Sequence, residues 1–314
     1  MKAFLGLDTS NYTTSAALYF PQEDRIVQSK RLLPVKAGER GLRQSDAVFH
    51  HTVALPEMVH TLFRERAVEL CGVCASVTPR RAEGSYMPCF LVGAGAGRML
   101  AETHGVPFYD TSHQHGHIAA ALFGSGKLEL LEQRFLAFHV SGGTTEALLI
   151  QPEESDLFRC TLVASSLDLK AGQAIDRTGV LLGLRFPCGK ALDALSLESA
   201  RTFSVRPSMK GADCSLSGVE NQCKAMIERG EPACDVAKFC LVSVCAALEA
   251  MTAALLEQYG GLPVLFAGGV MSNTLMRKRL QERFGAFFAE PEYSADNAAG
   301  TALIGYYQHQ QEKK

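Results

Sequence analysis

One pattern occurs twice in this chain, and it limits the folds open to it more than any other feature. Residues 5–19 (LGLDTSNYTTSAALY) and 136–150 (LAFHVSGGTTEALLI) each hold an apolar stretch, a short turn of small polar residues and a second apolar stretch. When the segments are aligned, Ser10 falls on Ser141. Each segment predicts a β-hairpin. Two hairpins in one register, one opening each half of the chain, predict a duplicated protein with two lobes.

The chemistry of these turns indicates a ligand. Small residues, hydroxyls and backbone N–H groups form a good cradle for phosphate oxygens. A nucleotide held between the two halves is therefore the functional interpretation. The alternative is a pair of ordinary hairpins, because Gly, Asn and Ser are common in turns of any kind. The shared register favours the functional interpretation.

The rest of the chain alternates strand and helix patterns. At 314 residues it has room for two domains. A long helix is expected over 42–67, with Pro56 kinking or dividing it, and a helix rich in Gly and Ala over 90–105. In the second half, helices are expected over 171–184, 215–227, 233–259 and 274–284, with a core strand at 262–267. This alternation predicts an α/β fold with mixed sheets.

Composition excludes several classes of protein. The net charge of −2 gives no overall attraction to nucleic acid, so an RNA contact needs a local patch such as 80–81 or 277–279. No run of about 18 apolar residues lacks a charge, so no membrane span is expected. The ten cysteines lack the spacing of a disulfide framework, which favours a reducing cytoplasm.

A histidine cluster, HQHGH at 113–117, is the clearest candidate for metal binding. On a helix His113 and His117 share a face and can hold one ion, whereas His115 points elsewhere and is expected to face solvent or to be structural. Gln114 stands where a zinc protease needs a glutamate base, which disfavours that activity. Surface histidines on an amphipathic helix are the alternative. Asp296 is the candidate third ligand, and two imidazoles with one carboxylate suit iron or zinc.

Two further segments point to a nucleotide. The stretch VLFAGGV at 264–270 ends a core strand in glycines, which lets a planar ring approach the backbone. Asn273 follows it, either as a helix cap or as a ribose or base contact. Asp176, on a helix that contains glycine, is a candidate for a ribose hydroxyl or is simply an exposed acid.

These motifs occur in one order: the DTS hairpin, HxxxH, VSGGxT, AGxAxDxT, PxG, SxSG, AGGVxxN and xDNxA. In that order the chain resembles the TsaD family over nearly its whole length. The resemblance implies an actin-like, sugar-kinase-like fold of two duplicated lobes, with mixed sheets flanked by helices. It places the lobes at 1–124 and 125–295, with 296–314 as a closing helix that packs at their junction.

The same resemblance implies transfer of a threonylcarbamoyl group from threonylcarbamoyl-AMP to N6 of the adenosine beside the tRNA anticodon. It implies ATP or an adenylate as ligand, one divalent metal, tRNA as substrate and a TsaB-like partner subunit in the cytoplasm. By position, the metal ligands are His113, His117 and Asp296. The residues that match its nucleotide contacts are Val140, Ser141, Gly142, Gly143, Thr144, Asp176, Gly189 and Asn273.

The chain also departs from the family pattern. Thr144 replaces a histidine, Gln173 a glutamate and Cys188 a glycine, while 11–13 lack the two acids of the family opening. Side chains that transfer protons or orient the acyl group are thereby lost, and no residue is assigned as catalytic. Two alternatives therefore remain open: a catalytically weakened nucleotide-binding scaffold or regulatory paralogue, and a small-molecule kinase or carbamoyltransferase. For a kinase, Asp8 is the acid that the sequence places best.

Overall fold

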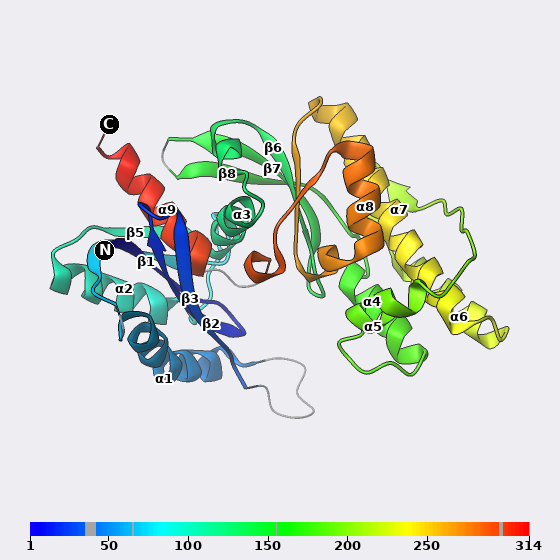
Figure 1. The fold of residues 1–314 in the computed structure, drawn as a ribbon, viewed down its shortest axis with the longest axis horizontal. Helices are drawn as coiled ribbons and strands as arrows, with labels where there is room; N and C mark the ends of the chain where they lie inside the picture. The colour runs from blue at the N-terminus through cyan, green and yellow to red at the C-terminus, as the bar shows by residue number, and fades with distance from the viewer. Residues whose placement is uncertain (35–41, 65, 155, 295–297, 314) are drawn as a thin grey trace. The chain divides into compact units, whose positions relative to one another are not determined.

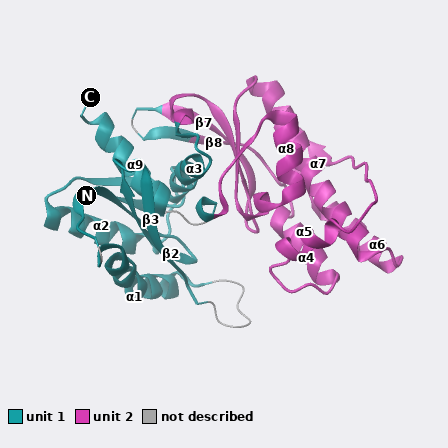
Figure 2. Ribbon diagram, in the orientation of Figure 1, with its two compact units in different colours: residues 1–128, 153–159, 292–314 teal, residues 129–152, 160–291 magenta. Residues whose placement is uncertain are grey.

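The computed structural model describes residues 1–34, 42–64, 66–154, 156–294 and 298–313. Figure 1 shows its helices and strands, and Figure 2 marks the two compact units into which it divides. Unit 1 contains residues 1–128, 153–159 and 292–314, and unit 2 contains residues 129–152 and 160–291.

Each unit is built largely on one five-stranded sheet, and the two sheets have the same topology. In unit 1 the order is β3(Arg25–Leu32), β2(Thr13–Phe20), β1(Lys2–Thr9), β4(Glu69–Thr78), β5(Phe108–Ser112). The second sheet repeats this order as β8(Leu157–Ser165), β7(Thr145–Glu153), β6(Phe135–Val140), β11(Val264–Ala267), β12(Phe287–Phe288). In both sheets the first two strands along the chain pair antiparallel, and the last two run parallel to the first strand. The predicted duplication is confirmed.

The hairpin register is also the one that the sequence predicts. Thr9 pairs with Thr14 at the end of β1 and β2, and Val140 pairs with Thr145 at the end of β6 and β7. Each pair lies at the same position in its repeat. The two turns between these pairs are therefore structurally equivalent.

Helices cover both faces of the first sheet, which explains why β1 is buried over seven of its eight residues. Leu5 and Leu7 face the apolar core beside α1(Gln44–Phe63) and α2(Phe90–His104). Gly6 faces the opposite way, onto α9(Ala298–Gln311). A Cβ on Gly6 would lie 2.2 Å from the Ala298 carbonyl oxygen, so only glycine allows this approach. Pro56 lies inside α1 and does not divide it.

Unit 2 packs its helices around one large core. That core includes residues of α4(Ala171–Leu181), α6(Ser217–Glu228), α7(Ala233–Tyr259) and α8(Thr274–Phe284). Among the described helices α7 alone is long and apolar enough to cross a membrane, and 67% of its most apolar stretch is buried inside the fold. That is the environment of a core helix. All ten cysteines are free thiols.

The remaining elements include several that the sequence did not predict. Strand β8, the short hairpin β9(Ser208–Lys210)–β10(Asp213–Ser215) and helix α5(Gly189–Ser196) were all missed. The helix expected over 171–184 ends at Leu181, and α5 begins at Gly189, the last residue of the predicted turn at 186–189. Helix α3(His113–Gly124) begins where the histidine motif begins.

Candidate functional site

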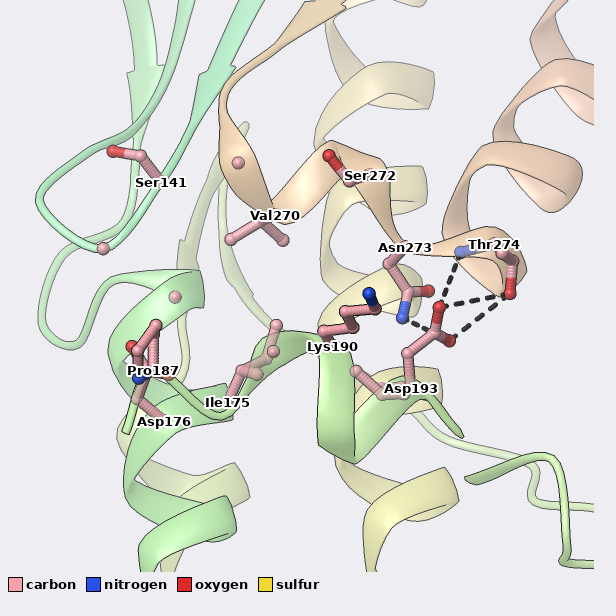
Figure 3. A pocket seen from close by; sticks show the side chains of 15 residues that line it. Ser141, Ile175, Asp176, Pro187, Lys190, Asp193, Val270, Ser272, Asn273 and Thr274 are labelled. Atoms are coloured by element: carbon pink, nitrogen blue, oxygen red, sulfur yellow. Dashed lines mark hydrogen bonds between the residues drawn. The ribbon is translucent and has the colours of Figure 1, made fainter. Parts of the chain in front are cut away.

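Unit 2 contains a cavity of about 620 Å³, which is the size of a small-molecule site (Figure 3). Five parts of the chain form it: the β6–β7 turn, α4, the start of α5, Leu241 of α7 and the segment that joins β11 to α8. Its lining contains five of the eight predicted nucleotide contacts, which are Ser141, Gly142, Asp176, Gly189 and Asn273.

The other three predicted contacts, Val140, Gly143 and Thr144, do not line the cavity. Val140 is buried at the end of β6, against the backbone of Gly268. Gly143 and Thr144 complete the turn, and both of their N–H groups donate to the Ser141 hydroxyl, at 3.3 and 3.1 Å. These three residues shape the turn that places Ser141 and Gly142 at the cavity.

The turn is joined to the N-terminus of α4. Ala171, the first residue of that helix, donates its backbone N–H to the Thr145 hydroxyl at 2.8 Å. The Gly172 N–H donates to the Ser141 carbonyl at 3.1 Å. Helix N-termini carry partial positive charge, so this corner of the cavity favours an anion.

Asp176 has one oxygen in use and one available. Its Oδ1 accepts a hydrogen bond from the Cys188 N–H at 2.8 Å, which fixes the carboxylate at the edge of the cavity. Its Oδ2 makes no hydrogen bond with the described residues. A carboxylate oxygen held in this way can accept hydrogen bonds from ligand hydroxyl groups.

Asn273 has two structural partners. Its side-chain oxygen accepts from the Met276 N–H at 3.0 Å, which makes it the N-cap of α8, and its Nδ2 donates to Asp193 at 2.8 Å. Asp193 also accepts from the N–H and hydroxyl of Thr274. The capping interpretation of Asn273 is therefore confirmed, and Figure 3 shows the Asp193 cluster on one side of the cavity.

Sequence reasoning missed Asp193 and Lys190. Both lie in the unpredicted helix α5, and in Figure 3 the Lys190 ammonium extends towards Asn273. Lys190 makes no hydrogen bond or ion pair with the described residues. The only sequence signal for the pair was their position just after the PxG turn.

Unit 1 contains the histidine motif. The two Nε2 atoms of His113 and His117 lie 2.9 Å apart, and the His113 Nδ1 lies 2.7 Å from Oδ2 of Asp8. Asp8 is fully buried, and the same oxygen accepts from the Ser76 hydroxyl at 3.0 Å. Its Oδ1 has no hydrogen-bond partner in the part of the chain that the structure describes.

This arrangement fits a metal ion. An ion that binds two imidazoles at about 2.1 Å each keeps their nitrogens about 3.0 Å apart at the right angle of an octahedral site and about 3.4 Å apart at the tetrahedral angle that zinc prefers, so the two rings need to move by at most about half an ångström. A carboxylate on the far nitrogen of a ligating histidine is the usual means of fixing its tautomer, and Asp8 has that place on His113. No group of three metal-binding side chains occurs among the described residues. The predicted third ligand, Asp296, lies outside them.

His115 has a structural role. Its Nδ1 pairs with the Ser112 hydroxyl and its Nε2 with the Phe158 carbonyl, each at 2.7 Å, and its ring stacks on Phe158. Burial lowers the pKa of His115. The structural alternative is thus confirmed, and the expectation that His115 faces solvent is wrong because the residue is only 2% exposed.

The two basic runs proposed for RNA are compensated by carboxylates. Arg81 pairs with Asp110 and Asp156. Arg277, Lys278 and Arg279 each lie within 4.0 Å of a glutamate. Within the described ranges, neither run forms a cluster of uncompensated cations.

Solved structures similar to this chain identify its fold class. HypF from T. kodakarensis matches at a TM-score of 0.62 and 11% identity, over 99% of this chain and 48% of that chain. Component A of the Acidaminococcus fermentans (R)-2-hydroxyglutaryl-CoA dehydratase matches at 0.54 and 16%, over 99% and 100%. A putative N-acetylmannosamine kinase from Listeria monocytogenes matches at 0.53 and 10%, over the same shares. The protein has the actin-like ATPase fold.

Sequence comparison then gives the family. Residues 33–303 match the TsaD family, tRNA N6-adenosine threonylcarbamoyltransferase. Proteins of that name from two strains of Thermus thermophilus are each 30% identical over 98% of this chain, and over 93% and 92% of their own length. The chain belongs to the TsaD family.

Proposed function

We propose that this protein transfers a threonylcarbamoyl group from threonylcarbamoyl-AMP to N6 of the adenosine beside the tRNA anticodon. The observation that carries the proposal is the set of glycines around the cavity. At Gly142, Gly189 and Gly269 an added Cβ would meet open space, and none of them has a φ that requires glycine. Neither packing nor conformation explains glycine there, whereas the close approach of a ligand does.

The cavity offers a complementary group for each part of an adenylate. The phosphate would lie against Ser141 and Gly142 at the N-terminus of α4, where the helix dipole favours an anion. The ribose hydroxyls would donate to Oδ2 of Asp176. The base would lie over the backbone of Gly269, which has no side chain in the way, and beside the Val270 side chain.

The histidine motif would hold one divalent ion, iron or zinc, through the Nε2 atoms of His113 and His117, with Asp296 as third ligand. When bound, the ion would supply Lewis acidity and a template at the acyl-phosphate end of the substrate. Asp8 would accept the Nδ1 proton of His113, 2.7 Å away, so that its Nε2 lone pair would be available to hold the ion.

One observation favours a second function, that of a nucleotide-binding scaffold without transferase activity. Gln173 stands where the family has a glutamate, and its side chain accepts from the Lys170 N–H at 3.2 Å. It is therefore part of the cap of α4. The kinase alternative loses its base, because Asp8 is fully buried in β1 and bound to His113.

Family membership further supports tRNA as substrate, a TsaB-like subunit as partner and the reducing cytoplasm as compartment. The ten free thiols are consistent with that compartment.

The test is a direct transfer assay. The purified protein, a TsaB-like subunit from the same genome, threonylcarbamoyl-AMP and unmodified tRNA are incubated, and modified adenosine is measured by mass spectrometry. Modification that is lost in Asp176→Asn supports the transferase. Adenylate binding without modification establishes the scaffold instead, and the absence of adenylate binding refutes both.

A further inference from the structure

A second cavity in unit 2, of about 400 Å³, is formed by α7, α8 and the segment 203–207. None of the residues that line it lines the adenylate cavity. Two sides of it are apolar: Val242 and Ala246 on α7, and Phe203, Val205 and Pro207 on the crossing segment. The third side carries charge.

That charge consists of one buried carboxylate and two guanidinium groups. Glu249 is 5% exposed, and its two oxygens accept from Nε and Nη2 of Arg279 at 3.0 and 2.8 Å. Arg283, one turn further along α8, reaches the same carboxylate only at 3.5 Å. Of the residues that line the cavity, Glu249 is the only acid. One positive charge is left uncompensated.

The guanidinium groups also have unused donors. A guanidinium has five N–H donors and stays protonated in proteins. Arg279 uses two of them on Glu249 and Arg283 uses one, and neither group makes another hydrogen bond with the described residues. The buried Glu249 thus orients Arg279 beside an apolar hollow, while Arg283 is held loosely.

A neighbouring hollow shows that this excess of positive charge is confined to the second cavity. It has a volume of about 210 Å³ and shares Phe203 with the second cavity. Its two arginines, Arg201 and Arg229, both pair with Glu231, and Arg201 also lies 3.9 Å from Asp235. In that hollow two guanidinium groups lie beside two carboxylates, so its net charge does not favour the binding of an additional anion.

We propose that the cavity between α7, α8 and 203–207 binds a small organic anion. Its carboxylate or phosphate would pair with Arg283 and the free edge of Arg279, because guanidinium groups bind such anions through paired hydrogen bonds. Its flat apolar body would lie against Phe203, Val242 and Ala246. This site is separate from the proposed transferase chemistry and does not depend on it.

The test is a titration of the full-length protein, followed by ligand-detected NMR, with benzoate, phenyl phosphate, benzamide and inorganic phosphate. Benzoate and phenyl phosphate are expected to bind more tightly than benzamide, which has the same body without the charge. Phenyl phosphate is expected to bind more tightly than inorganic phosphate. Equal binding within either pair, or no binding by the two aromatic anions, overturns the proposal.

Variants locate the site. Arg283→Gln keeps much of the side chain and removes the charge, and it should weaken aromatic-anion binding by roughly tenfold or more. Ala250→Leu fills the cavity without changing a charged group, and it should also weaken the binding of the aromatic anions. Arg277→Gln, on the same helix but outside the lining, is the control and should not. Unchanged binding in both of the first two variants, with folding confirmed by thermal melts, refutes the assignment.

Discussion

In the first hairpin the two polar residues that flank the turn, Ser10 and Thr13, are buried, whereas the equivalent turn of the second hairpin opens onto the 620 Å³ cavity. Ser10 and Thr13 are 6% and 4% exposed, while Ser141 and Thr144 are half-buried. Between them Asn11 is half-buried where Gly142 is exposed, and Tyr12 and Gly143 are both exposed. The backbones match, since each turn is closed by a strand pair in the same register. Duplication therefore preserved the geometry of the hairpin, and the side chains gave the two copies different surroundings.

The equivalent threonines show how the copies differ. The Thr14 hydroxyl pairs with Nδ1 of His51, a buried side chain on α1, at 2.8 Å. The Thr145 hydroxyl instead accepts from the backbone N–H of Ala171, at the start of α4. Each threonine ties its hairpin to a following helix. In the second copy that contact brings a helix N-terminus to the turn, which suits an anion, and in the first it buries an imidazole.

The largest expected effect comes from blocking one turn and not the other. Gly142→Leu places a side chain in the cavity and should weaken AMP binding by about 100-fold, because a filled site cannot relax around the ligand. The matched variant is Asn11→Leu, at the aligned position of the first turn, which loses a hydrogen bond with Gln44. It should leave binding unchanged within about threefold. Calorimetric titration measures both, and equal losses would show that both turns hold the nucleotide.

The first hairpin should instead matter for the metal. Asp8→Asn removes the carboxylate that holds His113, and it should lower the affinity for Zn²⁺ or Co²⁺ by about 10–100-fold. Competition with a chelator measures this, and the visible spectrum of the Co²⁺ protein reports the ligand geometry. Ser76→Ala removes a hydrogen bond to the same oxygen without touching His113, so its effect should be smaller. Unchanged affinity and spectrum in Asp8→Asn would contradict a role in orienting His113.

A third comparison exchanges the two threonines for valine. Thr145→Val leaves the Ala171 N–H without its acceptor and should weaken AMP binding by roughly tenfold. Thr14→Val removes the Nδ1 partner of His51, whose Nε2 already has none among the described residues, and should lower the free energy of unfolding by about 1–3 kcal/mol. Urea denaturation and AMP titration of both variants separate the effects. A binding loss in Thr14→Val without loss of stability would remove the distinction between the copies.

The sequence predicted those features of the two copies that depend on residues close together in the chain. Alternating apolar residues and a turn of fixed length give the hairpins and their register, because both depend on neighbours in the chain. HxxxH gives a shared helix face for the same reason. The resemblance to the TsaD family added the order of the motifs and the actin-like fold.

The contacts that separate the two copies were not predicted, because they join distant residues. Asp8 and His113 are 105 positions apart, and Asn273 and Asp193 are 80 apart. His51 is one of a pair of histidines in an amphipathic helix, and nothing in the local pattern distinguishes it from a surface residue. Lys190 and Asp193 were missed because α5 has only eight residues and follows a Pro-containing turn.

The smallest expected effect is a pH dependence of stability that originates in unit 1. Burial lowers the pKa of His51 and of His115, and both lie in that unit. In the unfolded chain each titrates near 6.5. At a pH between the lowered pKa of the folded protein and about 6.5, each of these histidines is protonated in the unfolded chain and neutral in the folded protein. The stability that these two groups contribute is therefore complete above about pH 6.5 and is lost as the pH falls.

His51→Asn removes one titrating group and keeps an acceptor or donor near the Thr14 hydroxyl. Urea denaturation from about pH 7.5 down to about 5.5, the range that spans the unfolded pKa, should show a steep loss of stability in the wild type and a shallower loss in the variant. The difference is at most about 1.4 kcal/mol per pH unit, the limit for one proton. Because the variant still contains His115, whose pKa burial also lowers, some pH dependence of stability should remain. If the two slopes are equal, His51 is protonated as easily in the folded protein as in the unfolded chain, and the burial of the first copy has no electrostatic consequence.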